Sequence, residues 1–113
     1  MHEYSIISAL VGRVQREVDA RPGAVVRRLH VRIGELAGVE IPLLATAFET
    51  CRARTVCETA ELAIAAVPAV WRCARCGREL PAGAVLRCCD RPARLAAGDD
   101  IFLDRIEMEV PDV

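Results

Sequence analysis

The chain has 113 residues, a net charge of −1 and 53 % hydrophobic residues, but only 4 % aromatic ones. These values argue against disorder and against a generally polyanion-binding surface, and they require a core built mostly of Ala, Val, Leu and Ile. The length suits one modest domain, or one domain that carries a small insert.

The amino-terminal segment does not have the pattern of a secretory signal. Glu3 lies in the region that should be basic, and Arg13 and Arg16 interrupt the apolar stretch. No apolar run is long enough to span a bilayer. We therefore expect a cytoplasmic protein, in which the six cysteines act as metal ligands or free thiols and not as a disulfide framework.

The first two elements follow from hydrophobic periodicity. Apolar residues recur at helical spacing over residues 5–18, with Ser5 as the expected N-cap and Pro22 and Gly23 beyond the end. Alternation over residues 25–33 then predicts a half-buried strand. His30 falls on the polar side of this strand, so we interpret it as a solvated residue.

A second helix is predicted next, with Pro42 in its first turn. Cys51 lies on its apolar face and Cys57 just after its end, so we interpret both as small buried or incidental thiols. Another strand begins near Leu62 and ends at Pro68.

The last strand is marked by alternation over residues 106–110, while Ile101 and Leu103 have the opposite parity. This change of parity predicts a β-bulge near Asp104. The expected fold is therefore α+β, with two helices on a small sheet.

Charge is distributed unevenly along the chain. Residues 70–97 contain six Arg and two acidic residues, whereas residues 98–113 contain one Arg and six acidic residues. We expect residues 1–69 and 98–113 to form one domain, and residues 70–97 to form an insert before the last strand.

The insert contains the pattern of a zinc knuckle. Cys73 and Cys76 have the spacing of two thiolate ligands of one Zn²⁺, and Gly77 permits the turn that follows them. Cys88 and Cys89 are placed to complete the site, but neighbouring side chains of an extended chain point to opposite faces. Both can bind one metal only if the chain turns sharply between them.

Other assignments for this unit remain open. Asp90, water or a distant cysteine could supply the fourth ligand, and a C-x-x-C pair also serves thiol–disulfide chemistry. The six Arg also suit a zinc-ribbon regulator that binds nucleic acid or protein, although Trp71 alone offers little for base stacking.

The chain begins with MHE. The amine of Met1, the backbone nitrogen of His2 and the His2 imidazole can close adjoining chelate rings on one metal. Such a nitrogen-rich tetragonal site suits Ni²⁺ or Cu²⁺, and Glu3 is next to it. Because the imidazole must be neutral to bind, we expect nickel affinity to fall below about pH 6.

Four segments together carry a resemblance: MHE at 1–3, HVRIGELAGVE at 30–40, CARCG at 73–77 and DRIEMEV at 104–110. Over essentially the whole chain and in this order, they resemble the HypA/HybF family of hydrogenase-maturation nickel metallochaperones. The pair CC departs from the second CxxC that is usual in that family. The departure puts the geometry of the zinc site in question.

The resemblance implies a small mixed sheet with two helices and an inserted zinc-ribbon-like domain. It implies a nickel site with His2 as ligand, backbone nitrogens from Met1 and Glu3, and Glu40 nearby, and a structural zinc on Cys73, Cys76, Cys88 and Cys89. The expected partners are a HypB-like GTPase and the hydrogenase large-subunit precursor, with the chain a monomer or homodimer. No catalytic constellation is found in the sequence, so we do not expect an enzyme.

Overall fold

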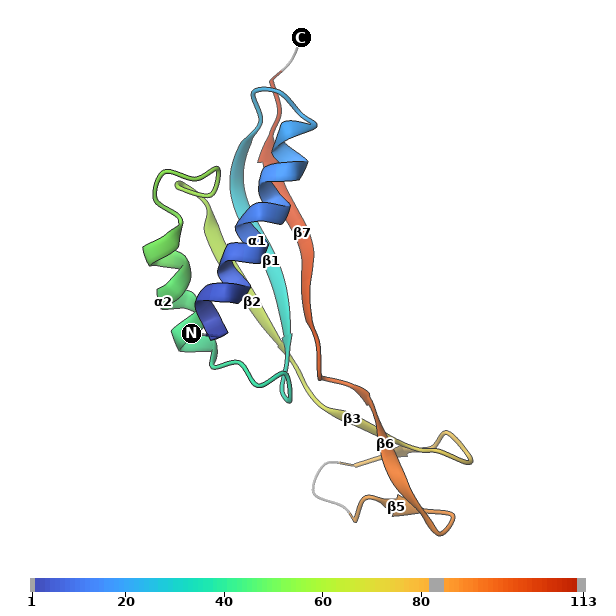
Figure 1. Ribbon diagram of the computed structural model, residues 1–113. Coiled ribbons are helices and arrows are strands. Elements are labelled where there is room, and N and C mark those ends of the chain that lie inside the picture. The colour runs from blue at the N-terminus through green and yellow to red at the C-terminus, as the bar shows by residue number, and fades with distance from the viewer. Residues whose placement is uncertain (1, 82–84, 112–113) are drawn as a thin grey trace.

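The computed structural model describes residues 2–81 and 85–111, which form two sheets, one of them covered by two helices (Figure 1). The molecule is elongated and measures 60 × 33 × 16 Å. A three-stranded sheet and both helices form one end, and a four-stranded sheet forms the other. The predicted α+β class with an inserted unit before the last strand is confirmed.

The two helices and three strands predicted from periodicity are present, apart from the expected start of the first helix, and the insert adds four short strands that were not predicted. Their bounds are α1 His2–Asp19, β1 Val25–Gly34, α2 Ile41–Cys51, β2 Glu61–Val67, β3 Val70–Cys73, β4 Glu79–Leu80, β5 Arg87–Cys88, β6 Arg91–Ala97 and β7 Ile101–Glu109. We call α1, β1, α2, β2 and β7 the body, and residues 70–97 the insert.

Helix α1 begins at His2, so the prediction that Ser5 is its N-cap is wrong. Nothing in residues 2–4 breaks a helix, and Glu3 in the first turn interacts favourably with the positive end of the helix dipole. The helix can therefore extend three residues beyond Ser5 toward the terminus.

Strand β1 is the centre of the body. It pairs in parallel with β2 and antiparallel with β7, which makes the sheet mixed. His30 lies opposite Arg105 and Val31 lies opposite Leu103, so Asp104 is an extra residue on β7. The predicted bulge near Asp104 is confirmed, and it restores the inward direction of the apolar residues on both sides of it.

Both helices cover the same face of this sheet and contact each other (Figure 1). The core between the helices and the sheet consists of buried aliphatic side chains, one aromatic ring and one thiol: Ile7, Val14, Val26, Leu29, Val31, Ile33, Leu44, Ala47, Phe48, Cys57 and Ala60. Cys57 is thus a buried thiol, as predicted, and Cys51 packs against the same core.

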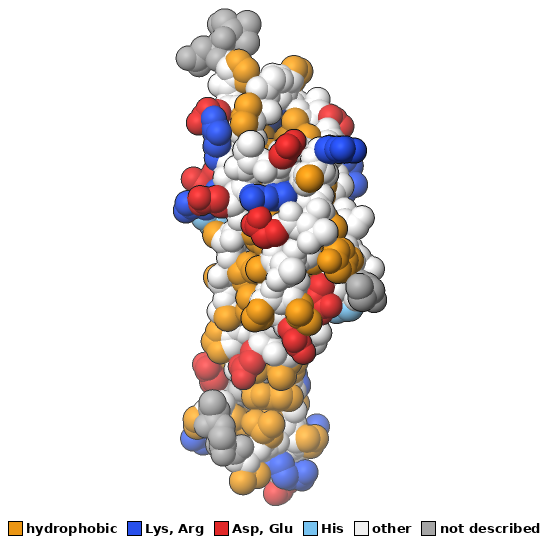
Figure 2. All heavy atoms as spheres, turned by 90° about the vertical axis from the view of Figure 1, so that its left-hand side faces the viewer, with side chains coloured by type: hydrophobic (Ala, Val, Ile, Leu, Met, Phe, Trp, Pro, Cys, Tyr) orange, Lys and Arg blue, Asp and Glu red, His pale blue; other side chains and the backbone are white. Residues whose placement is uncertain are grey.

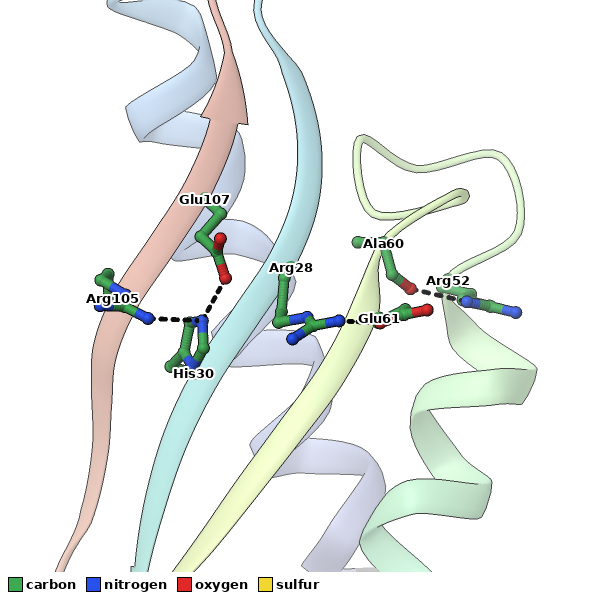
Figure 3. A network of polar contacts seen from close by, with 7 residues as sticks. All are labelled: Arg28, His30, Arg52, Ala60, Glu61, Arg105 and Glu107. Atoms are coloured by element: carbon green, nitrogen blue, oxygen red, sulfur yellow. Dashed lines mark hydrogen bonds and ion pairs between the residues drawn. The ribbon is translucent and has the colours of Figure 1, made fainter.

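The opposite face of the sheet carries paired charges (Figure 3). The ring of His30 contacts the carboxylate of Glu107, and Nη2 of Arg105 lies 3.1 Å from Nε2 of His30. Arg28 pairs with Glu61 on the neighbouring strand at 2.6 Å. His30 is therefore half-buried in a polar network and is not the freely solvated residue predicted from the sequence.

The body and the insert meet where three backbone segments cross. The N–H of Leu36 donates to the carbonyl of Gly98 (2.7 Å), and the N–H of Ala69 donates to the carboxylate of Glu35 (2.9 Å). A Cβ on Gly34 would lie 2.2 Å from the carbonyl carbon of Gly98, so no side chain fits between them. The loop after β1 is thereby fastened to both chain segments that connect the two sheets.

Candidate metal centres

The insert brings four cysteine thiols together. One sulfur atom from each of Cys73, Cys76, Cys88 and Cys89 lies within 4.8 Å of all the others. The Sγ atoms of Cys76 and Cys88 are 3.9 Å apart, and those of Cys88 and Cys89 are 3.8 Å apart. Tetrahedral Zn²⁺ with Zn–S bonds near 2.3 Å requires S···S separations of about 3.8 Å. The cluster therefore fits zinc.

The first two cysteines lie on a knuckle at the end of β3. The N–H of Gly77 donates to the carbonyl of Cys73 (3.0 Å), and φ of Gly77 is +75°. This turn directs the backbone N–H groups of Arg75 and Cys76 at Sγ of Cys73, at 3.4 and 3.5 Å. Glycine is suited to this conformation because it lacks a Cβ.

Cys88 and Cys89 lie on the hairpin formed by β5 and β6, whose loop has two residues. Arg87 pairs with Pro92 and Cys88 with Arg91, so Cys89 and Asp90 are the two loop residues. Their φ angles are +53° and +57°, as a type I′ turn requires at both central positions. The left-handed backbone supplies the sharp turn that two adjacent ligands need, and the CC departure is compatible with a four-cysteine site.

The thiols of the cluster have unequal proton affinities. Hydrogen bonds from the N–H groups of Cys76 and Arg75 lower the pKa of the Cys73 thiol to about 6. Hydrogen bonding with the thiols of Cys88 and Cys73 raises the pKa of Cys89 to about 12, and the negative charge of a Cys73 thiolate adds a smaller electrostatic penalty against a second anion. A cation placed among the four sulfur atoms would remove this penalty.

The alternatives left open by the sequence receive less support. The group of possible ligands among the described residues contains four cysteines and does not include Asp90, which serves as a turn residue. Cys73 ends a strand and Cys76 lies in a turn, whereas a redox pair usually begins a helix.

The residues predicted to bind nickel lie in the body, near the starts of α1 and α2. His2 is exposed and Glu3 half-buried in the first turn of α1, while Met1 lies outside the described residues. Glu40 is the exposed residue at the N-cap of α2, and its side chain makes no capping hydrogen bond. In Figure 1 both helices begin at the same end of the body.

Comparison with known proteins decides the family. The family model described as hydrogenase/urease nickel incorporation, metallochaperone, hypA, matches residues 1–108. The chain belongs to the HypA family. It is 36 % identical to the hydrogenase maturation factor HypA of Shewanella halifaxensis, covering 96 % of this chain and 98 % of that one. The factor of the same name from Wolinella succinogenes is also 36 % identical, with 99 % and 98 % covered.

Solved structures agree with this assignment. The solution structure of the nickel metallochaperone HypA from Helicobacter pylori matches with a TM-score of 0.72 and 26 % identity, covering 96 % of this chain and 98 % of that one. A second solution structure of HypA matches with a TM-score of 0.75 at 26 % identity. The chain is thus a metallochaperone-family protein in hydrogenase maturation, with a cysteine cluster compatible with zinc.

The surface gives little support to the alternative of a nucleic-acid-binding regulator. On the face drawn in Figure 2, acidic and basic side chains of the described residues are intermingled and form no large basic patch. In the insert, Arg72 lies 3.9 Å from Glu79, so part of its positive charge is balanced locally. No helix among residues 2–81 and 85–111 is long and apolar enough to cross a membrane.

The type I′ turn at Cys89 and Asp90 was not recognised from the sequence, although Asp is a residue typical of such turns. The attachment of Glu35 to Ala69 was not predicted either. No local pattern signals it, because the two residues are 34 positions apart and meet only through the pairing of β1 with β2.

Proposed function

We propose that this chain binds Ni²⁺ at its amino terminus and delivers it in the cytoplasm during maturation of [NiFe] hydrogenase. One observation carries the proposal: a chain of the HypA family begins with MHE and presents His2, exposed, at the very start of α1. Four cysteines of the insert would hold a structural Zn²⁺, and reduced thiols suit that compartment.

The position of the helix start favours the proposed nickel site. The first four N–H groups of a helix have no partner inside the helix, so the backbone nitrogens of His2 and Glu3 are not needed to hold α1 together. With the imidazole of His2 and the amine of Met1 they would form four nitrogen ligands in tetragonal geometry, which Ni²⁺ favours. Glu40 would lie close to this site as a supporting carboxylate.

Delivery requires that nickel can leave as well as bind. A site built on an exposed chain end has few surrounding groups, so a partner protein can reach the metal directly. The proposed partners are a HypB-like GTPase and the precursor of the hydrogenase large subunit. The transfer is an exchange of ligands and needs no catalytic residue, so the chain would act as a carrier and not as an enzyme.

The proposal is tested by native mass spectrometry and elemental analysis of the untagged protein, with the second histidine as a matched control. We expect one Zn²⁺ in every form, and one additional Ni²⁺ in the wild type and in His30→Ala. The variant His2→Ala and a chain extended at its amino terminus should bind no nickel. Equal nickel binding by all forms would remove the terminal site from the account.

A second pair of variants tests the backbone nitrogen of residue 3. Proline is tolerated in the first turn of a helix but has no N–H, so Glu3→Pro keeps α1 and removes this ligand. Glu3→Gln keeps the nitrogen and removes only the charge. We expect nickel affinity to fall more than about tenfold in the first variant and less than about threefold in the second. The opposite order would mean that the carboxylate, and not the nitrogen, binds nickel.

A further inference from the structure

The four thiols of the cluster differ in their access to solvent. Cys73 is buried and Cys88 is half-buried, whereas Cys76 and Cys89 are exposed. Zinc holds its cysteine ligands as thiolates, and the thiolate is the form of cysteine that reacts with oxidants. A small oxidant in solution can therefore reach two of the four ligands, Cys76 and Cys89.

The hydrogen bonds of the knuckle separate Cys76 from Cys73. Sγ of Cys73 accepts hydrogen bonds from the backbone N–H groups of Arg75 and Cys76, at 3.4 and 3.5 Å. These bonds withdraw electron density from the sulfur of Cys73 and make it a weaker nucleophile. Among the described residues, Sγ of Cys76 receives no backbone N–H and contacts other thiols of the cluster. Cys76 is thus both the more exposed and the more nucleophilic sulfur of the knuckle.

Positive charge flanks Cys76 on the same turn. Arg75 and Arg78 are exposed, and neither forms an ion pair with another of the described residues. Nearby guanidinium groups favour the thiolate form of cysteine. They also stabilise negative charge that develops on an oxygen atom leaving from the oxidant.

We propose that Cys76 is an oxidation site, at which a hydroperoxide converts the zinc cluster into a disulfide between Cys76 and Cys88 and releases the metal. The inference rests on the structural zinc of the proposed function. It differs from the C-x-x-C redox pair considered above, because the second sulfur comes from the other hairpin and not from Cys73.

The chemistry takes place in two steps. The thiolate of Cys76 attacks the peroxide, so an S–O bond forms, the O–O bond breaks, and the leaving hydroxide takes up a proton and becomes water. The thiolate of Cys88 then attacks Sγ of Cys76, so an S–S bond forms and the S–O bond breaks. The second hydroxide also becomes water. Two electrons have passed from two thiolates to one peroxide.

Distances favour Cys88 as the second sulfur. Its Sγ lies 3.9 Å from that of Cys76, on a different element. Cys89 cannot form a relaxed disulfide with Cys88, because neighbouring Cα atoms are about 3.8 Å apart and disulfides usually need at least about 4.4 Å. Cys73 is within 4.8 Å of Cys76, but it is buried and its sulfur accepts the two N–H groups.

The disulfide would replace one cross-link by another. Only the thiolates of Cys73 and Cys89 remain for Zn²⁺, and two ligands are too few for a structural site. The new bond joins the knuckle after β3 to strand β5, two parts of the insert that zinc also joins. The sulfur atoms of Cys76 and Cys88 thus stay together, and reduction by a thiol restores the ligand set. The oxidised insert should keep more amide protection than the insert treated with a chelator.

Zinc release and disulfide mapping test the inference on the untagged full chain, after elemental analysis has shown one Zn²⁺ per chain. With hydrogen peroxide below one equivalent and no thiol in the buffer, a chelating dye should detect one Zn²⁺ for each peroxide consumed. Trypsin cleaves after arginine and so places Cys73, Cys76 and the adjacent pair Cys88 and Cys89 in three separate peptides. Mass spectrometry should find the Cys76 peptide joined to the third peptide through Cys88.

Two matched variants locate the reactive sulfur. Cys76→Asp and Cys89→Asp each leave three thiolates and add a carboxylate, which is also a zinc ligand. We expect peroxide to release zinc more than about tenfold more slowly from Cys76→Asp than from wild type, and within about threefold of the wild-type rate from Cys89→Asp. Cys51→Ala removes a thiol of the body and should leave the rate unchanged.

The outcomes distinguish this inference from the proposed function. Zinc that stays bound while peroxide is consumed, a disulfide between Cys73 and Cys76, or equal rates in the two aspartate variants overturns the inference and leaves the proposed function intact. A chain without zinc before oxidation contradicts both. Mapping of the wild type needs no variant, so it remains decisive if either aspartate variant fails to hold zinc.

Discussion

The body and the insert are stabilised in different ways. The body buries eleven residues between two helices and a sheet, among them Phe48, Leu29 and Ile7. Among the described residues of the insert only Cys73 and Leu80 are buried, and the sheet there has strands of as few as two residues. A small unit with so little core needs a metal or another cross-link to fold.

The two proposed metal sites need different surroundings, because one metal would be structural and the other transported. A structural ion must be enclosed by ligands from different elements, and the thiols of the insert come from β3, from the knuckle and from the β5–β6 turn. A transported ion must remain accessible, and the terminus of α1 offers ligands from adjacent residues. Under the proposed function, the same chain would hold zinc firmly and release nickel.

Removal of zinc should show the largest difference in stability between the insert and the body. On treatment with a strong chelator we expect residues 70–97 to lose their structure, because the binding free energy of the metal is the folding free energy of this unit. The body should keep its helices. Amide spectra recorded before and after chelation check this prediction for each region.

The variant Cys73→Ala should have the same effect as the chelator and lower zinc affinity more than about 100-fold. Cys57→Ala, which changes a thiol of the body, is the matched control and should leave zinc binding intact. Loss of α1 and α2 together with the insert would show that the body depends on zinc as well.

A change in the core of the body should have the converse effect. Phe48 is 1 % exposed, and Phe48→Ala should lower the free energy of unfolding of the body by about 3–5 kcal/mol. The folded fraction should still bind one zinc. Urea denaturation with a parallel zinc titration measures both quantities.

Phe102→Ala is the control for this experiment, because Phe102 lies on the outer face of β7 and is 51 % exposed. It should cost less than about 1 kcal/mol. A similar loss in both variants would contradict the division between a packed face and an open face of the sheet.

The smallest effect is expected at the type I′ turn. Asp90 has φ of +57°, which a β-branched residue adopts only with strain. Asp90→Val should therefore lower zinc affinity by about tenfold, whereas Asp90→Gly should match or exceed the wild type. Competition with a chelating dye measures these differences. Equal losses in both variants would instead indicate a role for the carboxylate of Asp90.

Much of the body could be predicted from the sequence because its elements are long and periodic. The alternation in β1 and the change of parity around Asp104 were sufficient to place the strands and the bulge. The start of α1 was missed because Ser5 has the residue type of an N-cap, whereas the actual start depends on residues near a chain end. The pairing of His30 with Glu107 was missed because it joins strands 77 residues apart.

The cysteine site was predicted as a set of candidates but not as a geometry. The side chains of adjacent cysteines can bind one metal together, or they can point to opposite faces of an extended chain. Only the backbone conformation decides between these two arrangements. Two residues with positive φ at Cys89 and Asp90 provide the turn, and neither is a glycine. Sequence rules that search for glycine at such positions overlook this case.

The crossing of Gly34, Gly98 and Ala69 has a consequence for the modularity of the chain. A Cβ on Gly98 would lie only 2.6 Å from Cα of Ala69, so the polypeptide departs from the body and returns to it at nearly one point. The sheet of the body is complete without the insert, because β1 alone joins β2 to β7. We therefore expect that a unit of different length or sequence can replace the insert at this point without changing the strand order of the body.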